Sequence, residues 1–187
     1  LKDKNYHIIT TNADNAFDVA GYDMDKVFHI QGKYGLMQCS KHCHAKTYQD
    51  EALMRRLAVE QENMEVDYRS IPLCPECGAP LEVNKRNAEK GMVEDPIFFE
   101  HLDKYNEFLE NNRDKKTLFI EIGVGFTTPQ FIKYPFYREL DKNPNALMVT
   151  MNQKKYQFPE RIASRVLWFN QNSKDLTLKV EELLENN

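Results

Sequence analysis

The sequence has no long apolar run, no excess of positive charge and little glycine or proline. Its 187 residues include 7 glycines and 8 prolines, and 41% are hydrophobic and 29% charged. This composition excludes collagen-like, disordered and membrane-spanning chains and is typical of a globular protein. At about 150 residues per domain, the length predicts one domain with room for a small additional module.

The charge balance also excludes a class of partner. The 25 Lys and Arg residues are outnumbered by 29 Asp and Glu residues, which gives a net charge of −4. A non-specific nucleic-acid binder needs basic residues to neutralise phosphates, so we expect no nucleic-acid partner. No run approaches the about 18 apolar residues of a membrane helix, and residues 1–5 lack the apolar core of a signal peptide. We therefore expect no membrane association and a cytoplasmic location.

The four cysteines form two close pairs, Cys39 with Cys43 and Cys74 with Cys77. Each pair can present two thiolates from one tight turn, and four thiolates make a closed tetrahedral zinc site. Two alternatives are weaker. Two disulfides are disfavoured in a reducing compartment, and four unrelated buried thiols are disfavoured by the pairing. We predict a structural zinc, with no open position for substrate.

The zinc-binding module is assigned to residues 36–96. His42 and His44 lie beside the first cysteine pair and could replace a cysteine, but we rank them as surface histidines. Between the pairs, residues 48–64 carry apolar side chains at helical spacing, which predicts an amphipathic helix within the module. The polar stretch 84–95 is the nearest approach to a linker.

Outside this module, short apolar runs alternate with helical periods. Strands are expected at residues 6–11, 117–123, 146–151 and 165–170. Helices are expected at 98–109, at 176–184 after a cap at Asn172 or Ser173, and less clearly at 129–135, where Pro135 interrupts the pattern. This alternation predicts an α/β fold with a parallel sheet, formed by residues 1–35 and 97–187 and interrupted by the zinc module.

Polar residues follow the expected strands, where parallel sheets bind their ligands. Thr11, Asn12 and Asp14 come directly after the first strand. The segment 123–129 begins with a glycine turn, where the backbone could approach a phosphate or ribose. Each signal is weak alone, because Asn and Asp are common in turns and caps and a glycine turn can simply join a strand to a helix.

Together and in this order, the motifs resemble those of the sirtuins, a family of NAD-dependent enzymes. The matching residues are Thr10-Thr11-Asn12-Ala13-Asp14, Ala20-Gly21, Gln31-Gly32, the two cysteine pairs, Gly123–Pro129 and the strand that ends at Asn152. The resemblance covers residues 6 to 184 and implies a Rossmann-like, sirtuin-type sheet with NAD as cofactor. It implies cofactor contacts by Thr11, Asn12, Asp14, Gln31, Gly123, Val124 and Asn152.

The sequence departs from the sirtuin pattern in three places. The opening glycine-rich NAD segment is absent from these residues, and together with a first residue that is Leu rather than Met this suggests a fragment, the carboxyl-terminal part of such a protein. Val124 and Gly125 replace the threonine and serine of the later motif, so one hydroxyl contact is lost unless Thr127 or Thr128 supplies it. Gln31 replaces the catalytic histidine.

The glutamine decides between activities. Sirtuin deacylation uses the histidine as a base, and an amide has no titratable acceptor near neutral pH. Cleavage of the nicotinamide bond passes through an oxocarbenium-like state, in which an amide can still position the ribose. His29 lies two residues away and points the same way on an extended segment, but it is displaced by about 7 Å, so it is not a simple replacement.

The combination of Asn12 and Gln31, in a sequence that otherwise has the sirtuin motifs, resembles the macrodomain-linked sirtuins of microbes. That resemblance implies a protein ADP-ribosyltransferase with Asn12 and Gln31 as the catalytic pair. It implies a lipoylated carrier akin to the glycine-cleavage H protein as substrate and a macrodomain hydrolase as partner. The alternatives are a NAD-dependent deacylase that uses another base, and a non-catalytic module that binds zinc and NAD.

Overall fold

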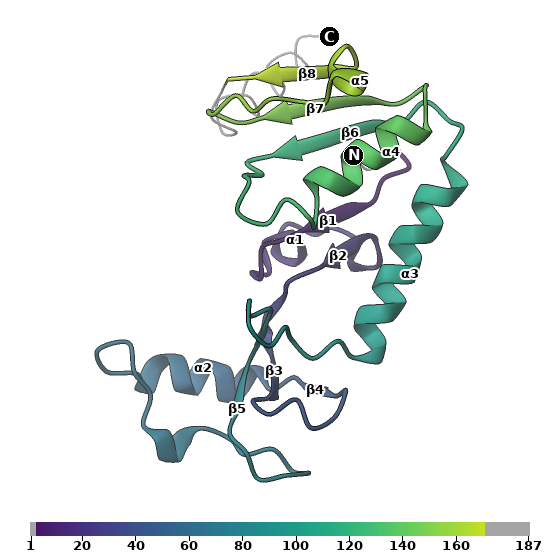
Figure 1. Cartoon of the computed structure of the whole chain (residues 1–187). Coiled ribbons are helices and arrows are strands. Elements are labelled where there is room, and N and C mark those ends of the chain that lie inside the picture. The colour runs from purple at the N-terminus through teal and green to yellow at the C-terminus, as the bar shows by residue number, and fades with distance from the viewer. Residues whose placement is uncertain (1–2, 171–187) are drawn as a thin grey trace. The chain divides into compact units, whose positions relative to one another are not determined.

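The computed structural model describes residues 3–170 and divides the chain into two compact units, with the boundary between Phe108 and Leu109. Figure 1 shows the order of the elements along the chain. No helix in residues 3–170 is long and apolar enough to span a membrane. The helix expected at 176–184, with its cap at Asn172 or Ser173, lies outside the described residues.

The first unit contains a two-stranded parallel sheet. Strand β1 (Ile8–Thr10) pairs with β2 (Val27–His29) so that Thr10 lies opposite His29. The connection holds a short helix α1 (Ala16–Val19) and a 3-10 turn, η1 (Met24–Lys26). The first strand was predicted, and it is shorter than residues 6–11.

Helix α3 (Pro96–Asn111) packs against this sheet. It begins with proline, whose missing N–H costs nothing at the first helical position, and the Asp95 carboxylate accepts a hydrogen bond from the Phe98 amide at 2.8 Å. The ring of Phe28 on β2 lies 5.1 Å from that of Phe98 and 6.1 Å from that of Tyr105. This aromatic packing explains the helical period predicted at 98–109.

The first unit also contains an antiparallel sheet that the sequence did not predict. Its order is β4-β3-β5, from β3 (Gly32–Cys39), β4 (Thr47–Tyr48) and β5 (Leu81–Lys85). Helix α2 (Glu51–Glu60), capped by the Asp50 carboxylate, confirms the helix expected within 48–64, and a 3-10 turn, η2 (Tyr68–Ser70), follows it.

The expectation of a linker at 84–95 is wrong. Asn84 belongs to β5 and is only 3% exposed. Its side-chain amide donates to Gln38 Oε1 at 2.8 Å and to the Val93 carbonyl at 2.9 Å. The polar residues of this stretch therefore include a buried hydrogen-bond network that ties residue 93 to the sheet. The division into residues 36–96 and the remainder stays a prediction.

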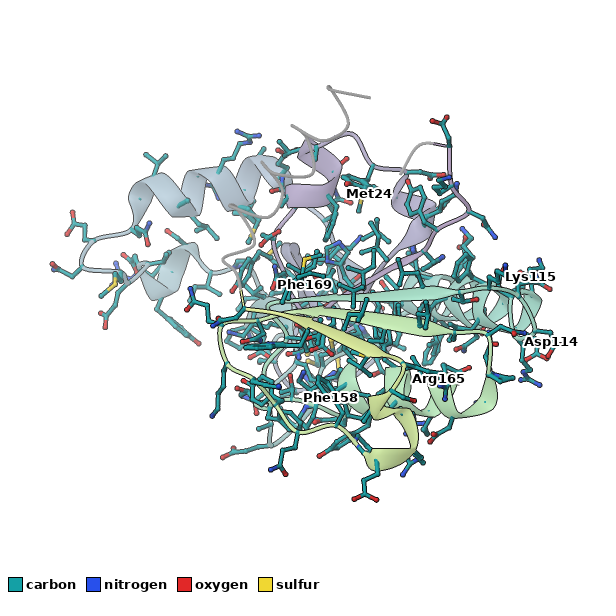
Figure 2. The ribbon with its side chains drawn as sticks, turned by 90° about the horizontal axis from the view of Figure 1, so that it is seen from above. Met24, Asp114, Lys115, Phe158, Arg165 and Phe169 are labelled. Atoms are coloured by element: carbon teal, nitrogen blue, oxygen red, sulfur yellow. The ribbon has the colours of Figure 1, made fainter. Side chains whose placement is uncertain are left out.

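The second unit is a three-stranded parallel sheet in the order β6-β7-β8. Its strands are β6 (Leu118–Ile122), β7 (Leu147–Met151) and β8 (Val166–Phe169), as predicted. Figure 2 labels Arg165 and Phe169 at the two ends of β8. The predicted α/β class with parallel strands is confirmed.

Helix α4 (Lys133–Lys142) packs on this sheet, with the ring of Phe136 4.9 Å from that of Phe119 on β6. A four-residue helix, α5 (Glu160–Ala163), precedes β8. The helix predicted at 129–135 is misplaced: α4 begins at Lys133, and Pro135 lies in its first turn. Proline does not interrupt a helix there, because the first amides have no partner within the helix.

Candidate functional site

The four cysteines lie together, as their spacing predicts. Their sulfur atoms all lie within 4.8 Å of one another, with Cys39 Sγ 3.5 Å from Cys77 Sγ and Cys43 Sγ 3.6 Å from Cys74 Sγ. These distances are too long for disulfides, whose sulfurs lie about 2 Å apart, and match the about 3.8 Å between thiolates around one tetrahedral zinc. The donor set therefore fits a closed zinc site.

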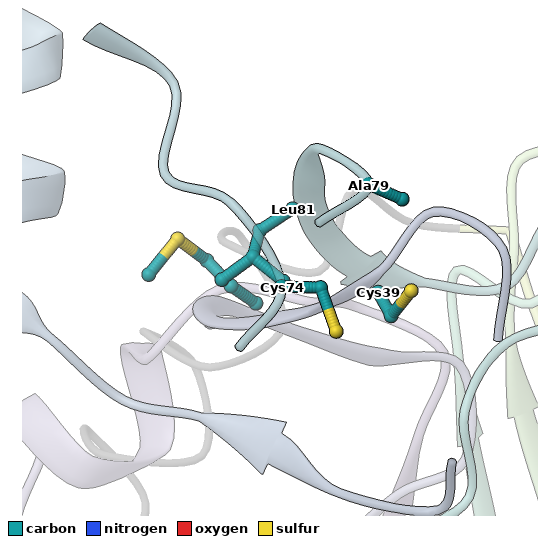
Figure 3. Packing of buried hydrophobic residues seen from close by; sticks show 5 residues of the cluster. Cys39, Cys74, Ala79 and Leu81 are labelled. Atoms are coloured by element: carbon teal, nitrogen blue, oxygen red, sulfur yellow. The ribbon is translucent and has the colours of Figure 1, made fainter. Parts of the chain in front are cut away.

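Local structure favours thiolates at the two buried cysteines. Backbone N–H groups of Cys43 and Lys41 lower the pKa of Cys39 against the effect of burial. Burial alone would raise the pKa of Cys74, but hydrogen bonds from the Cys77 and Glu76 backbone and from side chains bring it to about 6. Figure 3 shows Cys39 and Cys74 beside Ala79 and Leu81, with which they form a small core.

The two histidines beside the first pair are not plain surface residues. His44 Nε2 lies 3.3 Å from Cys74 Sγ and 2.9 Å from the Tyr48 hydroxyl. His42 Nε2 lies 3.0 Å from the side-chain nitrogen of Gln38, which is itself fully buried. Both imidazoles are partly buried: His44 contacts the cysteine cluster, and His42 contacts Gln38 instead. The expectation that they are surface histidines is wrong, because sequence spacing does not show burial.

The predicted residues of the first unit follow the paired ends of β1 and β2. Asn12 comes two residues after Thr10, and Gln31 comes two residues after its partner His29. The backbone amide of Asn12 donates to Thr10 Oγ1 at 3.1 Å, and the Asp14 carboxylate accepts from the Ala16 amide at 3.0 Å. The structure thus brings Thr11, Asn12 and Asp14 to the same sheet end as Gln31.

His29 has a supporting place beside these residues. It is 5% exposed, and its Nδ1 lies 3.1 Å from the carbonyl oxygen of Asn12. Burial lowers its pKa, and the hydrogen bond to the Asn12 backbone opposes that shift only in part. The buried ring contacts the Asn12 backbone, and the expectation that His29 is no replacement for the missing base stays a prediction.

Gln31 is anchored from the zinc module. Its carbonyl oxygen accepts a hydrogen bond from the Arg86 amide at 3.0 Å, and the Arg86 guanidinium donates to the Ile30 carbonyl at 3.2 Å and pairs with Glu94 at 2.6 Å. Sequence reasoning missed Arg86, because a lone arginine after a strand carries no distinguishing pattern.

The predicted residues of the second unit also meet at one place. Gly123 adopts a φ of +66° just after β6, and its amide donates to the Met151 carbonyl at 2.9 Å. The side-chain amide of Asn152, at the end of β7, donates to the Val124 carbonyl at 3.1 Å. Gly123 and Val124, which follow β6, therefore meet Asn152, which follows β7, at the carboxyl ends of neighbouring strands, where sheets of this class bind ligands. We call these three residues the candidate cofactor turn.

Beside this turn lies a buried ion pair that the sequence reasoning missed. Lys133 at the start of α4 pairs with Glu121 on β6, and both side chains are fully buried. Thr150 on β7 donates to the same carboxylate oxygen at 3.2 Å. The only sequence signal was a glutamate inside the apolar run of β6.

Comparison with solved structures identifies the fold. Two Sir2 structures, one bound to a propionylated peptide and one to an acetylated peptide, each superpose over 97% of this chain with a TM-score of 0.61, at 18% and 17% identity. The chain covers 65% and 64% of those two chains. The fold is that of the sirtuins, and the resemblance drawn from the motifs is confirmed.

The sequence relatives are more specific. A Staphylococcus aureus protein named protein ADP-ribosyltransferase is 56% identical over 167 residues, which are 89% of this chain and 53% of that protein. A Fusarium oxysporum protein named probable bifunctional ADP-ribose hydrolase/ADP-ribosyltransferase is 29% identical over 132 residues, 67% of this chain and 22% of that protein. The chain thus spans about half the length of the first relative and a smaller share of the length of the second. No family model matches it.

Proposed function

We propose that the protein is a NAD-dependent protein ADP-ribosyltransferase of the sirtuin type. The observation that carries this proposal is Gln31, which stands where the sirtuin motif has its histidine, at a strand end shared with Asn12. The 56% identity to a protein named protein ADP-ribosyltransferase supports the same activity.

The residues suit a transfer in which no side chain has to act as a strong base. The bond between nicotinamide and the ribose breaks, and nicotinamide leaves with the bonding electron pair. Hydrogen bonds from the Asn12 and Gln31 amides hold the ribose while positive charge develops on it. A nucleophile of the protein substrate then bonds to the ribose carbon and releases its proton to solvent.

The remaining residues are assigned to binding. Asp14 would hold the nicotinamide end of NAD, and Thr11, Gly123, Val124 and Asn152 would make further contacts with the cofactor. The zinc site has no open position and would hold the fold without taking part in the reaction. A cytoplasmic location belongs to the same proposal.

The proposed substrate is a lipoylated carrier protein akin to the glycine-cleavage H protein, with a macrodomain hydrolase that reverses the modification. The support is the pairing of Asn12 with Gln31, by which the chain resembles macrodomain-linked sirtuins. A relative whose name joins an ADP-ribose hydrolase to an ADP-ribosyltransferase agrees with such a pairing of activities.

The test uses the full-length gene product with NAD and a lipoylated carrier, and reads the carrier by intact mass. We expect one added ADP-ribose with nicotinamide release, none on the unlipoylated carrier, and none with Asn12→Ala or Gln31→Ala. Nicotinamide release that requires an acylated peptide would favour a deacylase instead. NAD binding without nicotinamide release would favour a non-catalytic module.

A further inference from the structure

The buried Glu121–Lys133 pair has a specific environment in the second unit. Burial raises the pKa of Glu121, opposed by the hydrogen bond and charge of Lys133 and by Thr150. Among residues 3–170, Lys133 is the cation that pairs with this carboxylate, and Glu121 Oε2 has no hydrogen-bond partner there. The charge of Glu121 therefore depends on Lys133.

The ammonium group of Lys133 also contacts two aromatic rings. It lies 5.1 Å from the centre of the Phe126 ring and 4.7 Å from the centre of the Tyr156 ring. The two rings lie 4.7 Å from each other at an angle of 54°. A desolvated cation beside two aromatic rings is a strong contact, because the ring faces carry negative charge density and no water competes.

These rings belong to the two loops that form the candidate cofactor turn. Phe126 comes three residues after Gly123, and Tyr156 comes four residues after Asn152. Phe126 is 41% exposed and borders an open pocket of about 610 Å³, where its ring also lies 6.5 Å from that of Tyr134 on α4. Lys133 thus contacts one ring from each loop, and the hydrogen bond from Asn152 to Val124 also joins the two loops.

We propose that Lys133 is a positioning residue for the cofactor turn: held by Glu121, its ammonium group fixes Phe126 and Tyr156 and so keeps Gly123, Val124 and Asn152 in the arrangement that binds NAD. The part of this inference that concerns NAD rests on the proposed function. The part that concerns the order of the turn does not.

The experiment separates positioning from simple stabilisation. Lys133→Met alone leaves a buried carboxylate without its partner and can destabilise the whole protein. The double variant Glu121→Met/Lys133→Met removes both charges with little change in volume, so the sheet can stay folded while the buried cation that contacts both rings is lost; Lys154, 5.5 Å from the centre of the Tyr156 ring, is kept. Lys142→Met is the matched control, because Lys142 lies on the same helix and pairs with Glu139 at 2.7 Å on the surface.

Two readouts are measured in the full-length gene product. The first, without NAD, is hydrogen exchange of the amides of residues 123–128, together with the emission of Trp168, the one tryptophan of these 187 residues, whose Nε1 donates to the Asn152 carbonyl at 3.0 Å. The second is KM and kcat for NAD. In the double variant we expect exchange about tenfold faster, shifted emission, and a KM about tenfold higher with kcat within about twofold, as for loss of a binding contact.

The outcomes are distinct. Exchange, emission and KM equal to those of the unaltered protein in a folded double variant would overturn the inference and leave the pair a purely structural feature. The same changes in Lys142→Met would also overturn it. If the unaltered protein neither binds nor consumes NAD, the proposed function fails, and the exchange and emission measurements still decide whether Lys133 orders the turn.

Discussion

Among the glycines of residues 3–170, Gly32 has the closest neighbouring atoms around its Cα. Its φ is +92°, and a Cβ added there would lie 2.1 Å from the carbonyl oxygen of Asn84. We expect Gly32→Ala to lower the free energy of unfolding by about 3 kcal/mol or more, from backbone strain and overpacking together. Urea denaturation measures this loss.

Gly91→Ala is the matched control for that substitution. Gly91 also has a positive φ, +73°, but nothing lies within 4 Å of the added Cβ. Only the strain remains, so we expect a loss of about 1 kcal/mol. An equal decrease in the free energy of unfolding in the two variants would show that the close approach to Asn84 does not contribute to it.

The protonation of His7 should make stability depend on pH. His7 packs against the rings of Tyr105 and Phe108, and burial first, then the charges of His101 and Lys26, lower its pKa from 6.5 to about 4. The unfolded chain therefore binds more protons between these values, so the stability contributed by neutral His7 is present above about pH 6.5 and is lost as the pH falls toward 4.

His7→Phe keeps a ring in this packing and removes the titration. We expect the urea midpoint of this variant to fall less between pH 7 and pH 5 than that of the unaltered protein. Zinc release at low pH affects both proteins, so the difference between them isolates His7. An identical pH dependence would contradict the assignment.

Residue-level prediction succeeded where the chemistry depends on short sequence spacing. The spacing within each cysteine pair predicts two metal ligands from one turn, and the structure brings the four sulfurs together. Glu121 and Lys133 could not be paired from the sequence, because they meet only after β6 and α4 have packed against each other. The catalytic roles of Asn12 and Gln31 stay predictions.

At the scale of elements, the zinc module should depend on its metal. Its apolar core is small, built from Met37, Leu81, Ala79 and the two buried cysteines, so the metal has to supply much of the stability. We expect Cys74→Ser to lose zinc and at least about 3 kcal/mol of stability, since structural zinc contributes on the order of 10 kcal/mol in small zinc domains. Metal content by mass spectrometry and the thermal midpoint check this.

His44→Ala is the matched variant for that prediction. His44 contacts Cys74 Sγ but does not belong to the four-sulfur set. We expect this variant to keep its zinc, with a smaller loss of stability. Loss of the metal in His44→Ala, or full zinc content in Cys74→Ser, would mean that the ligand set is assigned incorrectly.

Elements were predictable where the pattern of apolar residues was local. The parallel strands β6, β7 and β8 are short apolar runs and lie where they were expected. The antiparallel sheet of the zinc module was missed, because β4 has two residues and the alternation of apolar and polar residues in β5 covers only Leu81 to Asn84. Asn84 was read as linker because its burial depends on Gln38, 46 residues away.

At the scale of the whole molecule, a single side chain should determine which reaction prevails. Gln31→His restores a titratable base at the strand end. We therefore expect deacylation of an acetylated peptide to rise at least about tenfold, which is less than the about 10²–10⁴-fold that a well-placed general base typically contributes. Transfer to the carrier should fall. Both products are measured by mass in the same preparation.

The control for this prediction is Gln31→Asn, which keeps an amide but no base. It should not gain deacylation. If Gln31→His also fails to gain it, Gln31 is not what prevents deacylation.

Strand β3 begins at Gly32, directly after Gln31, and ends at Cys39, so one short segment serves both the proposed reaction and the metal. Its pairing with β5 is regular from Met37 to Cys39 and irregular between Gly32 and Met37. A residue inserted or deleted at 37–39 would turn Cys39 to the opposite face of the sheet, whereas residues 33–36 lie outside the ladder and can absorb a change of length. We therefore expect related proteins to vary in length at residues 33–36. At residues 37–39 we expect them to differ in side chains but not in the number of residues.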